Sequence, residues 1–216
     1  YLFKIFKIGV PAALSMLIMS IGLFIYNIIL SQTSSSESAI AAYATAHRIE
    51  HLFFIPIISV ATSMVTLVGM FYGAKEYGLI NSILKYCIKY ALMISVAFST
   101  IFYFLSNRIL SVFINDQNVI NIGVGYFNIF SFAIPFITLT MISSRVIQGL
   151  GKSYPMFIIT CLRVIIISCS LGWYFIVIDN KPLEYAWIAI LISCIISAII
   201  SFIWLIFELR KLKTSF

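Results

Sequence analysis

Residues 185–207 read YAWIAILISCIISAIISFIWLIF, a run that contains no charged residue. A helix needs about 20 apolar residues to cross the roughly 30 Å hydrocarbon core of a bilayer, and this run is long enough. Its serines, Ser193, Ser197 and Ser201, recur at a spacing of four, as small residues do where helices pack against one another in lipid. The run therefore predicts a membrane-spanning helix.

Five similar runs precede this one. Hydrophobic residues make up 62% of the chain, charged residues only 10%, and the mean hydropathy is +1.09. Because ordinary soluble domains are about a quarter charged, this composition predicts an all-α, polytopic membrane protein. We treat residues 1–216 as one six-helix unit. The predicted spans are residues 8–30, 39–74, 86–105, 119–146, 155–178 and 185–207.

Two segments need comment. The second run is longer than one bilayer crossing, and Pro56 predicts a kink within it. Residues 106–118 contain Arg108 and Asp116 and predict a polar loop between the third and fourth spans. The chain also begins at Tyr1 without a methionine or a signal-peptide pattern, so we expect it to be part of a longer polypeptide.

The basic residues predict the orientation of the helices. With the start of the chain placed inside, Arg48, Arg108 and Lys181 fall outside, and the other 11 of the 14 Lys and Arg residues fall inside. Such an imbalance places both ends in the cytoplasm of a plasma-membrane protein. It also explains the net charge of +7 without a nucleic-acid partner, so lipid is the expected surroundings. The inner set is Lys4, Lys7, Lys75, Lys85, Lys89, Arg145, Lys152, Arg163, Arg210, Lys211 and Lys213.

Three patterns in the sequence resemble chemical sites. The stretch His47-Arg48-Ile49-Glu50-His51 matches the H-x-x-E-H pattern of some zinc peptidases, but a polar patch at the end of a membrane helix explains it better. Gly151-Lys152-Ser153 resembles the end of a phosphate-binding loop, but the required upstream glycine is replaced by Val146. We therefore expect no ATPase, no enzyme and no metal site. The four cysteines lie in apolar runs without metal spacing: Cys87, Cys161, Cys169 and Cys194.

Polar residues inside the spans give the candidate substrate site. On the fourth span Asn128, Ser131, Pro135, Thr138 and Arg145 share one helical face. On the first span another face carries Met16, Ser20, Asn27 and Ser31. Such faces line a wet cavity or form hydrogen bonds between helices, and both readings stay open here. The predicted cavity residues are Ser20, Asn27, Asn128, Ser131 and Thr138.

Charges within the spans are few. We expect Arg145 and Arg163, near the inner ends of spans four and five, to reach the lipid headgroups. No acidic residue is expected deep in a span, although an ion-coupled site normally needs one.

The order of these pieces resembles the multidrug and toxic compound extrusion family. The first span opens with Lys7-Ile8-Gly9-Val10-Pro11-Ala12-Ala13, and the fourth closes with Val146-Ile147-Gln148-Gly149-Leu150-Gly151-Lys152. The second span carries Ala41-Ala42-Tyr43, His47-Arg48-Ile49, Pro56, Leu67-Val68-Gly69 and Gly73-Ala74-Lys75. Family members have twelve helices in two six-helix lobes, and the fourth-span ending is similar to the carboxyl-terminal lobe.

This resemblance implies an antiporter half that exports amphipathic, often cationic compounds in exchange for H⁺ or Na⁺. Its partner would be the other six-helix lobe of the same polypeptide. Sodium-type members carry a glutamate and an aspartate where this chain has Met19 and Ile137. We therefore expect no bound cofactor here and a coupling-ion site in the other lobe.

Three alternatives remain. A flippase of the same superfold, acting on a lipid-linked oligosaccharide or lipid II, would need several deep basic residues for pyrophosphate. Only Arg145 and Arg163 are candidates, which disfavours it. An intramembrane metalloprotease would use His47 and His51, and a purely structural membrane subunit would use neither set.

Overall fold

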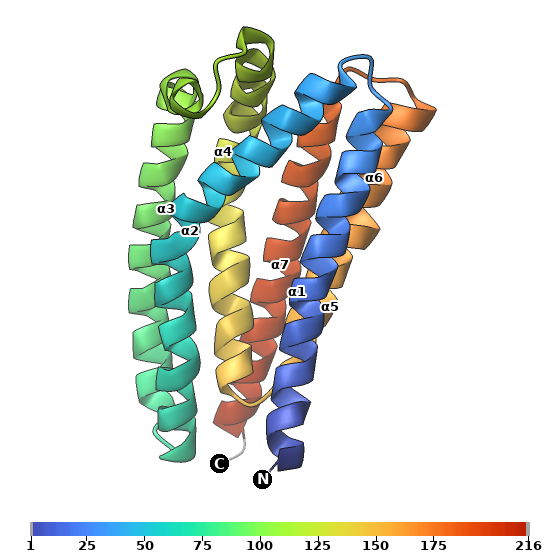
Figure 1. Ribbon diagram of the computed structural model, residues 1–216. Coiled ribbons are helices and arrows are strands. Elements are labelled where there is room, and N and C mark those ends of the chain that lie inside the picture. The colour runs from blue at the N-terminus through green and yellow to red at the C-terminus, as the bar shows by residue number, and fades with distance from the viewer. Residues whose placement is uncertain (1, 215–216) are drawn as a thin grey trace.

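The protein is a bundle of six long helical rods (Figure 1). The computed structural model describes residues 2–214, and the side chains of residues 9–212. Within these residues there is no β-strand, so the predicted all-α class is confirmed. Six helices are long and apolar enough to cross a membrane. The elements are α1 (Leu2–Ser31), α2 (Ser36–Gly73), α3 (Tyr77–Phe113), α4 (Gln117–Gly149), α5 (Tyr154–Cys161), η1 (Leu162–Cys169), α6 (Ser170–Trp173), η2 (Tyr174–Ile178) and α7 (Glu184–Thr214).

The third helix is longer than predicted. The loop expected at residues 106–118 is wrong, because α3 continues to Phe113 and α4 begins at Gln117. Ser106 and Leu110 are both buried, four residues apart on the inward face of α3. Polar residues in this stretch therefore belong to an amphipathic helix end, and Asp116 caps α4 by accepting a hydrogen bond from the Asn118 backbone N–H.

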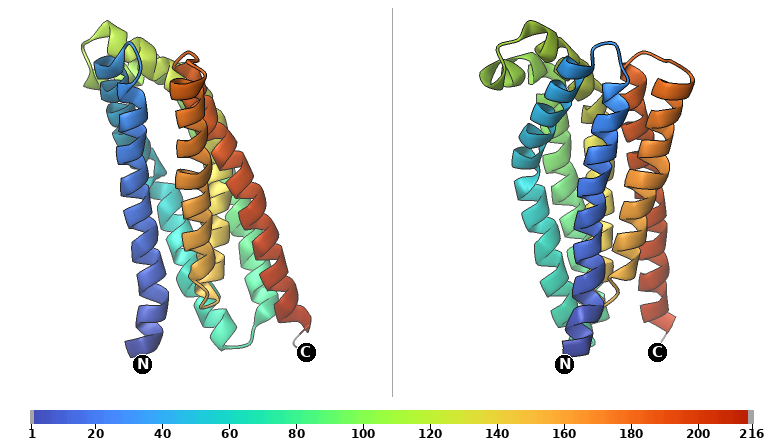
Figure 2. Two further views of the ribbon diagram at one scale, coloured as in Figure 1. Left: turned by 90° about the vertical axis from the view of Figure 1, so that its right-hand side faces the viewer. Right: turned by 45° about the vertical axis from the view of Figure 1, so that its right-hand side comes forward.

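Both termini lie at one end of the bundle, here called the termini end; the opposite end is called the far end (Figure 1). Helices α5, η1, α6 and η2 form one continuous fifth rod, which contains two π-helical stretches. In both views of Figure 2 this rod lies beside α1. Figure 1 also shows α2 bending between its two halves, and Pro56 lies in the middle of that helix, as the predicted kink requires.

Helix α4 is the centre of the bundle and packs on α2, α3 and α7. At the termini end it approaches α2 so closely that a Cβ on Gly149 would lie 2.9 Å from the Val65 carbonyl oxygen and 2.9 Å from Val68 Cβ. Gly69 faces the Gly149 carbonyl oxygen in turn. The glycine-containing endings of the second and fourth spans thus allow two backbones to touch.

Two buried clusters form the core. The termini-end cluster is aliphatic, and the far-end cluster is rich in aromatic residues. The termini-end cluster is Ala61, Met64, Val68, Ile80, Leu84, Cys87, Ala91, Ile142, Val146, Ile147, Leu150 and Leu205. The far-end cluster includes the aromatic residues Tyr26, Tyr43, Phe102, Tyr126, Phe127, Phe130 and Trp187, with Ile29, Leu30, Ile49 and Ile134 among its aliphatic members.

Candidate functional site

Three of the five predicted cavity residues form hydrogen bonds within their own helices. Ser131 and Thr138 are fully buried, and their hydroxyls donate to the carbonyl oxygens of Asn128 and Ile134. Ser20 lies exposed on α1 and donates to the Met16 carbonyl oxygen at 3.3 Å. A hydroxyl bonded one turn back has used its donor, although it can still accept. Their predicted contact with substrate remains a prediction.

The two asparagines differ from these hydroxyls. Both are half-buried, and the Asn27 side-chain oxygen is covered but has no hydrogen-bond partner. Helix α1 packs mainly on α2 and the fifth rod, whereas α4 packs mainly on α2, α3 and α7. The two amides therefore belong to differently packed sides of the bundle. A cavity shared by Asn27 and Asn128 stays a prediction.

A group of aromatic side chains in the far-end cluster was missed by the sequence patterns. Tyr43 on α2 is its centre: its ring lies 5.3 Å from Tyr26, 5.7 Å from Tyr126 and 5.8 Å from Trp187, between ring centroids. The Tyr26 hydroxyl donates to the Ala186 carbonyl oxygen and joins α1 to α7. Rings from α1, α2, α4 and α7 thus converge on one point, which rigid edge-to-face and stacked contacts hold in place.

A carboxyl group lies beside these rings. Glu50 is 4% exposed, and one of its oxygens, Oε1, has no hydrogen-bond partner. Its Oε2 lies 3.6 Å from Nδ1 of His47, one turn earlier on α2. Glu50 is thus a buried acidic residue of α2, and the expectation that no acidic residue lies deep in a span stays a prediction, because burial within the bundle does not give depth in the membrane. The spacing of Tyr43, His47 and Glu50 at i, i+4 and i+7 places them on one helical face, which was the available signal.

Arg163 is half-buried, and its guanidinium lies near the Cys194 thiol on α7. Its predicted reach to the lipid headgroups stays a prediction. Arg163 projects from the π-helical segment η1, where Val164 packs against Gly22 of α1. Arg145 is half-buried, and its guanidinium donates to Gln148 Oε1 at 3.0 Å.

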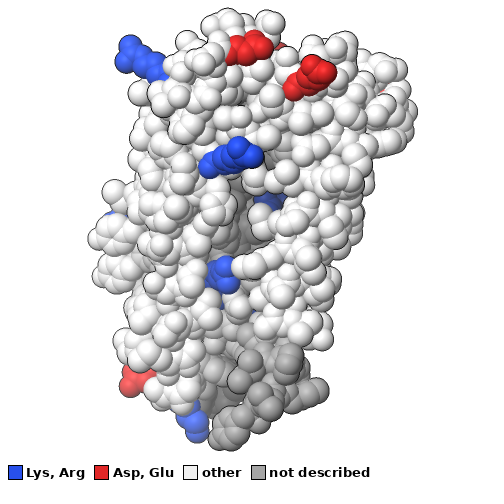
Figure 3. All heavy atoms as spheres, in the orientation of Figure 1, with Lys and Arg blue, Asp and Glu red and all other residues white. Residues whose placement is uncertain are grey.

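One face of the molecule is hollowed. Figure 3 shows the molecule hollowed near the middle of this face, with Lys and Arg atoms at the hollow and Asp and Glu atoms only towards the two ends of the bundle. The Lys and Arg residues within the spans of α2, α4 and the fifth rod include Arg48, Arg145 and Arg163. The charged atoms that this view shows at the hollow are therefore basic.

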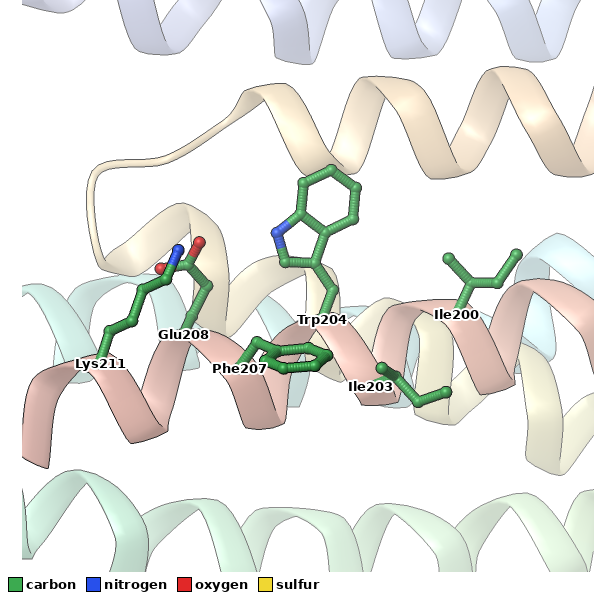
Figure 4. A pocket seen from close by; sticks show the side chains of 6 residues that line it. All are labelled: Ile200, Ile203, Trp204, Phe207, Glu208 and Lys211. Atoms are coloured by element: carbon green, nitrogen blue, oxygen red, sulfur yellow. The ribbon is translucent and has the colours of Figure 1, made fainter.

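A second depression lies on α7 at the termini end (Figure 4). It has a volume of about 360 Å³, and every residue that lines it comes from α7: Ile200, Ile203, Trp204, Phe207, Glu208 and Lys211. Glu208 forms an ion pair with Lys152 of the loop between α4 and α5. None of the five predicted cavity residues lines this depression.

The residues of the H-x-x-E-H pattern lie on α2. Over the part of the chain that the structure describes, no three His, Cys, Asp or Glu side chains come together as metal ligands would. Within this pattern His47 instead contacts Glu50 and stacks on Tyr43, with 6.2 Å between the ring centroids.

Comparison with known proteins identifies the family. The MatE family model matches residues 11–174. A probable multidrug resistance protein NorM of Buchnera aphidicola is 28% identical over 203 residues, which are 92% of this chain but 44% of that protein.

Solved structures agree with this match. A MOP superfamily transporter from Pyrococcus furiosus superposes with a TM-score of 0.92 and 25% identity, over 98% of this chain and 47% of that one. A multidrug resistance MATE family transporter in an outward-facing conformation gives a TM-score of 0.90 at 25% identity, over 97% of this chain and 47% of its own. Members of this family are transporters, which agrees with the prediction that the chain is not an enzyme. The chain therefore belongs to the MATE family of multi-pass membrane transporters and spans about half the length of the relatives it matches.

Proposed function

We propose that this chain forms one lobe of a secondary active antiporter that exports amphipathic, often cationic compounds in exchange for H⁺ or Na⁺. The observation that carries the proposal is the family match over residues 11–174, in a chain that covers about half of its relatives. The second lobe would complete the cavity, and rocking of the two lobes would expose it to alternate sides of the plasma membrane. Both ends of this segment would face the cytoplasm.

The charges of this lobe bear on how it would hold a cation. Of the seven acidic residues, Glu50 and Glu208 are buried, and the other five lie within a turn or so of a helix end. A cationic substrate would therefore place its apolar part against this lobe and find its counter-charge in the other lobe. The five are Glu37, Glu76, Asp116, Asp179 and Glu184.

Transport in vesicles tests this proposal. The native full-length protein is placed in everted membrane vesicles, and uptake of a fluorescent amphipathic cation is followed under an imposed pH gradient, an imposed Na⁺ gradient, or neither. We expect uptake with at least one gradient and its loss when an ionophore collapses that gradient. Uptake that is equal with and without both gradients would overturn the antiport mechanism.

A neutral and an anionic analogue of the same compound serve as matched controls. The proposed division of labour expects the cation to be preferred over the anion. A preference for the anion would agree better with the basic surface of this lobe alone, and would contradict the proposed counter-charge in the other lobe.

A further inference from the structure

Glu50 is held in surroundings that do not suit a permanent charge. It is 4% exposed and lies near Tyr43 and Tyr126 of the far-end cluster, and its Oε1 is covered without a hydrogen-bond partner. An ionised carboxylate in an apolar setting is strongly unfavourable unless it is fully paired, whereas a protonated one is much less so. The free energy of this buried group therefore depends on whether it carries a proton.

His47 connects this carboxyl group to the outside of the core. Its Nδ1 lies 3.6 Å from Glu50 Oε2, and its side chain is 37% exposed while that of Glu50 is 5% exposed. Stacking on Tyr43, with the ring planes 18° apart, orients the imidazole. Because an imidazole has two ring nitrogens, one in this position can take a proton from water on its exposed side and present another to the carboxyl group.

Titratable groups on several other elements lie in the region of Glu50. The Tyr126 hydroxyl of α4 lies beside the carboxyl group and can donate to it. The Cys194 thiol of α7 and the Arg163 guanidinium of η1 lie together nearby. The Tyr26 hydroxyl of α1 is occupied by the Ala186 carbonyl oxygen. On α2 itself Tyr43 is adjacent, and Arg48 and His51 are exposed.

We propose that Glu50 is a proton-binding site of this lobe, that His47 exchanges its proton with water, and that Tyr126 hydrogen-bonds the carboxyl group. In the loading step an imidazolium at His47 gives its Nδ1 proton to Oε2: the N–H bond breaks, the O–H bond forms, and both groups become neutral. Because 3.6 Å exceeds direct hydrogen-bond reach, the step takes a small side-chain rotation or one intervening water.

Loss of the proton would alter contacts between helices. A charged Glu50 attracts the Tyr126 hydroxyl of α4 more strongly than a neutral Glu50 does. Protonation thus biases how α2 packs against α4. Its use to drive transport rests on the antiport function proposed above; the binding of the proton does not.

Infrared difference spectroscopy of the full-length protein in proteoliposomes tests the proton site directly. We expect a C=O stretching band of a protonated carboxylic acid that appears as pH falls, that is lost in Glu50→Gln and that shifts in frequency in Glu50→Asp. Glu208→Gln is the matched control, since Glu208 is also buried but is paired with Lys152, and the band should persist there. A band unchanged in both Glu50 variants, or absent from the wild type at every pH, would overturn the proposal. If Glu50→Gln does not fold, the frequency shift of the band in Glu50→Asp decides whether Glu50 carries the proton.

A pH jump tests the role of His47. In His47→Asn the band should still reach its full amplitude but approach it more slowly than in the wild type, and an unchanged rate would refute the exchange role. Transport is measured in the same proteoliposomes. If wild-type transport is equal with and without both gradients, the antiport function is refuted, and the Glu50 band can still be measured. If transport is driven by a gradient but no Glu50 band is found, only the proton site is refuted.

Discussion

The two ends of the bundle are built in opposite ways. At the termini end, aliphatic side chains and the Gly149 backbone pack so closely against α2 that no added carbon fits. At the far end, large rings from four helices meet, and a carboxyl group that is incompletely bonded lies beside them. A closely packed glycine contact is suited to holding two helices together, and a titratable group beside aromatic rings is suited to a change of state.

Their acidic residues show the same contrast. Glu208 at the termini end is buried but paired with Lys152, whose side chain remains 51% exposed. Glu50 at the far end has only His47 within ion-pair distance among the described side chains, and one oxygen without a partner. The two buried carboxyl groups of this lobe therefore differ in their pairing: Glu208 has a basic partner on another element, whereas Glu50 keeps one oxygen without a partner.

The largest expected effect is a difference in cysteine labelling between the two ends of the bundle, because we expect them to lie on opposite sides of the membrane. Single cysteines at Lys75 and Lys152 (termini end) and at Ser35 and Asp116 (far end) are introduced into a background that lacks the native four cysteines. The basic residues of the termini end predict that only the far-end pair reacts with an impermeant maleimide in intact cells. The control is labelling of all four after permeabilisation. Labelling at Lys75 in intact cells would reverse the orientation.

Gly149→Ala tests whether the termini end depends on close backbone contact. The new Cβ would meet the Val65 carbonyl oxygen and Val68 Cβ, both at 2.9 Å, so we expect a loss of about 1–3 kcal/mol in stability. The measurement is the melting temperature of purified protein in detergent. Gly125→Ala on the same helix is the control, because nothing lies within 4 Å of its Cβ position and alanine favours helix by up to about 1 kcal/mol. Equal melting temperatures for the two variants would show that the contact adapts freely.

Glu208→Gln measures what pairing contributes at the termini end. The released Lys152 can turn to water because its side chain is half exposed, so we expect the free energy of unfolding to fall by only about 1 kcal/mol or less. A double-mutant cycle with Lys152→Gln, read by chemical denaturation, isolates the pair. A coupling of several kcal/mol would contradict the small expected effect and would make this pair a strong link between α7 and the loop after α4.

The smallest expected effect on stability concerns Asn27 and Asn128. Hydrogen bonds between membrane helices average about 0.6 kcal/mol, and the Asn27 oxygen makes none, so replacement of either residue by leucine should barely change the melting temperature. If these amides contact substrate, transport of three chemically different compounds should change unequally. Thr138→Val is the control for a buried polar group bonded within its own helix. Uniform loss in proportion to protein level would assign both amides to packing.

Local sequence patterns determined most of the architecture. Six apolar runs became six rods, because the need to satisfy backbone hydrogen bonds in lipid acts within each segment and requires no knowledge of its neighbours. The bend of the long helix α2 was also predictable from a local feature, because Pro56 removes a backbone hydrogen bond within that helix. The prediction of a loop at residues 106–118 was wrong because it relied on the polarity of Ser106 and Arg108. Both residues belong to α3, where Ser106 is buried and Arg108 is exposed near the helix end.

Tertiary structure alone decided which side chains meet. The glycines near the ends of the second and fourth spans are present in the motifs that carry the family resemblance, but only packing shows Gly69 and Gly149 facing each other. The face that carries Tyr43, His47 and Glu50 was likewise legible in the sequence. Its burial depends on Tyr126 and Trp187, which stand 83 and 144 positions after Tyr43 in the numbering. The free energy of a charged or polar group depends on what covers it, and a linear pattern does not contain that information.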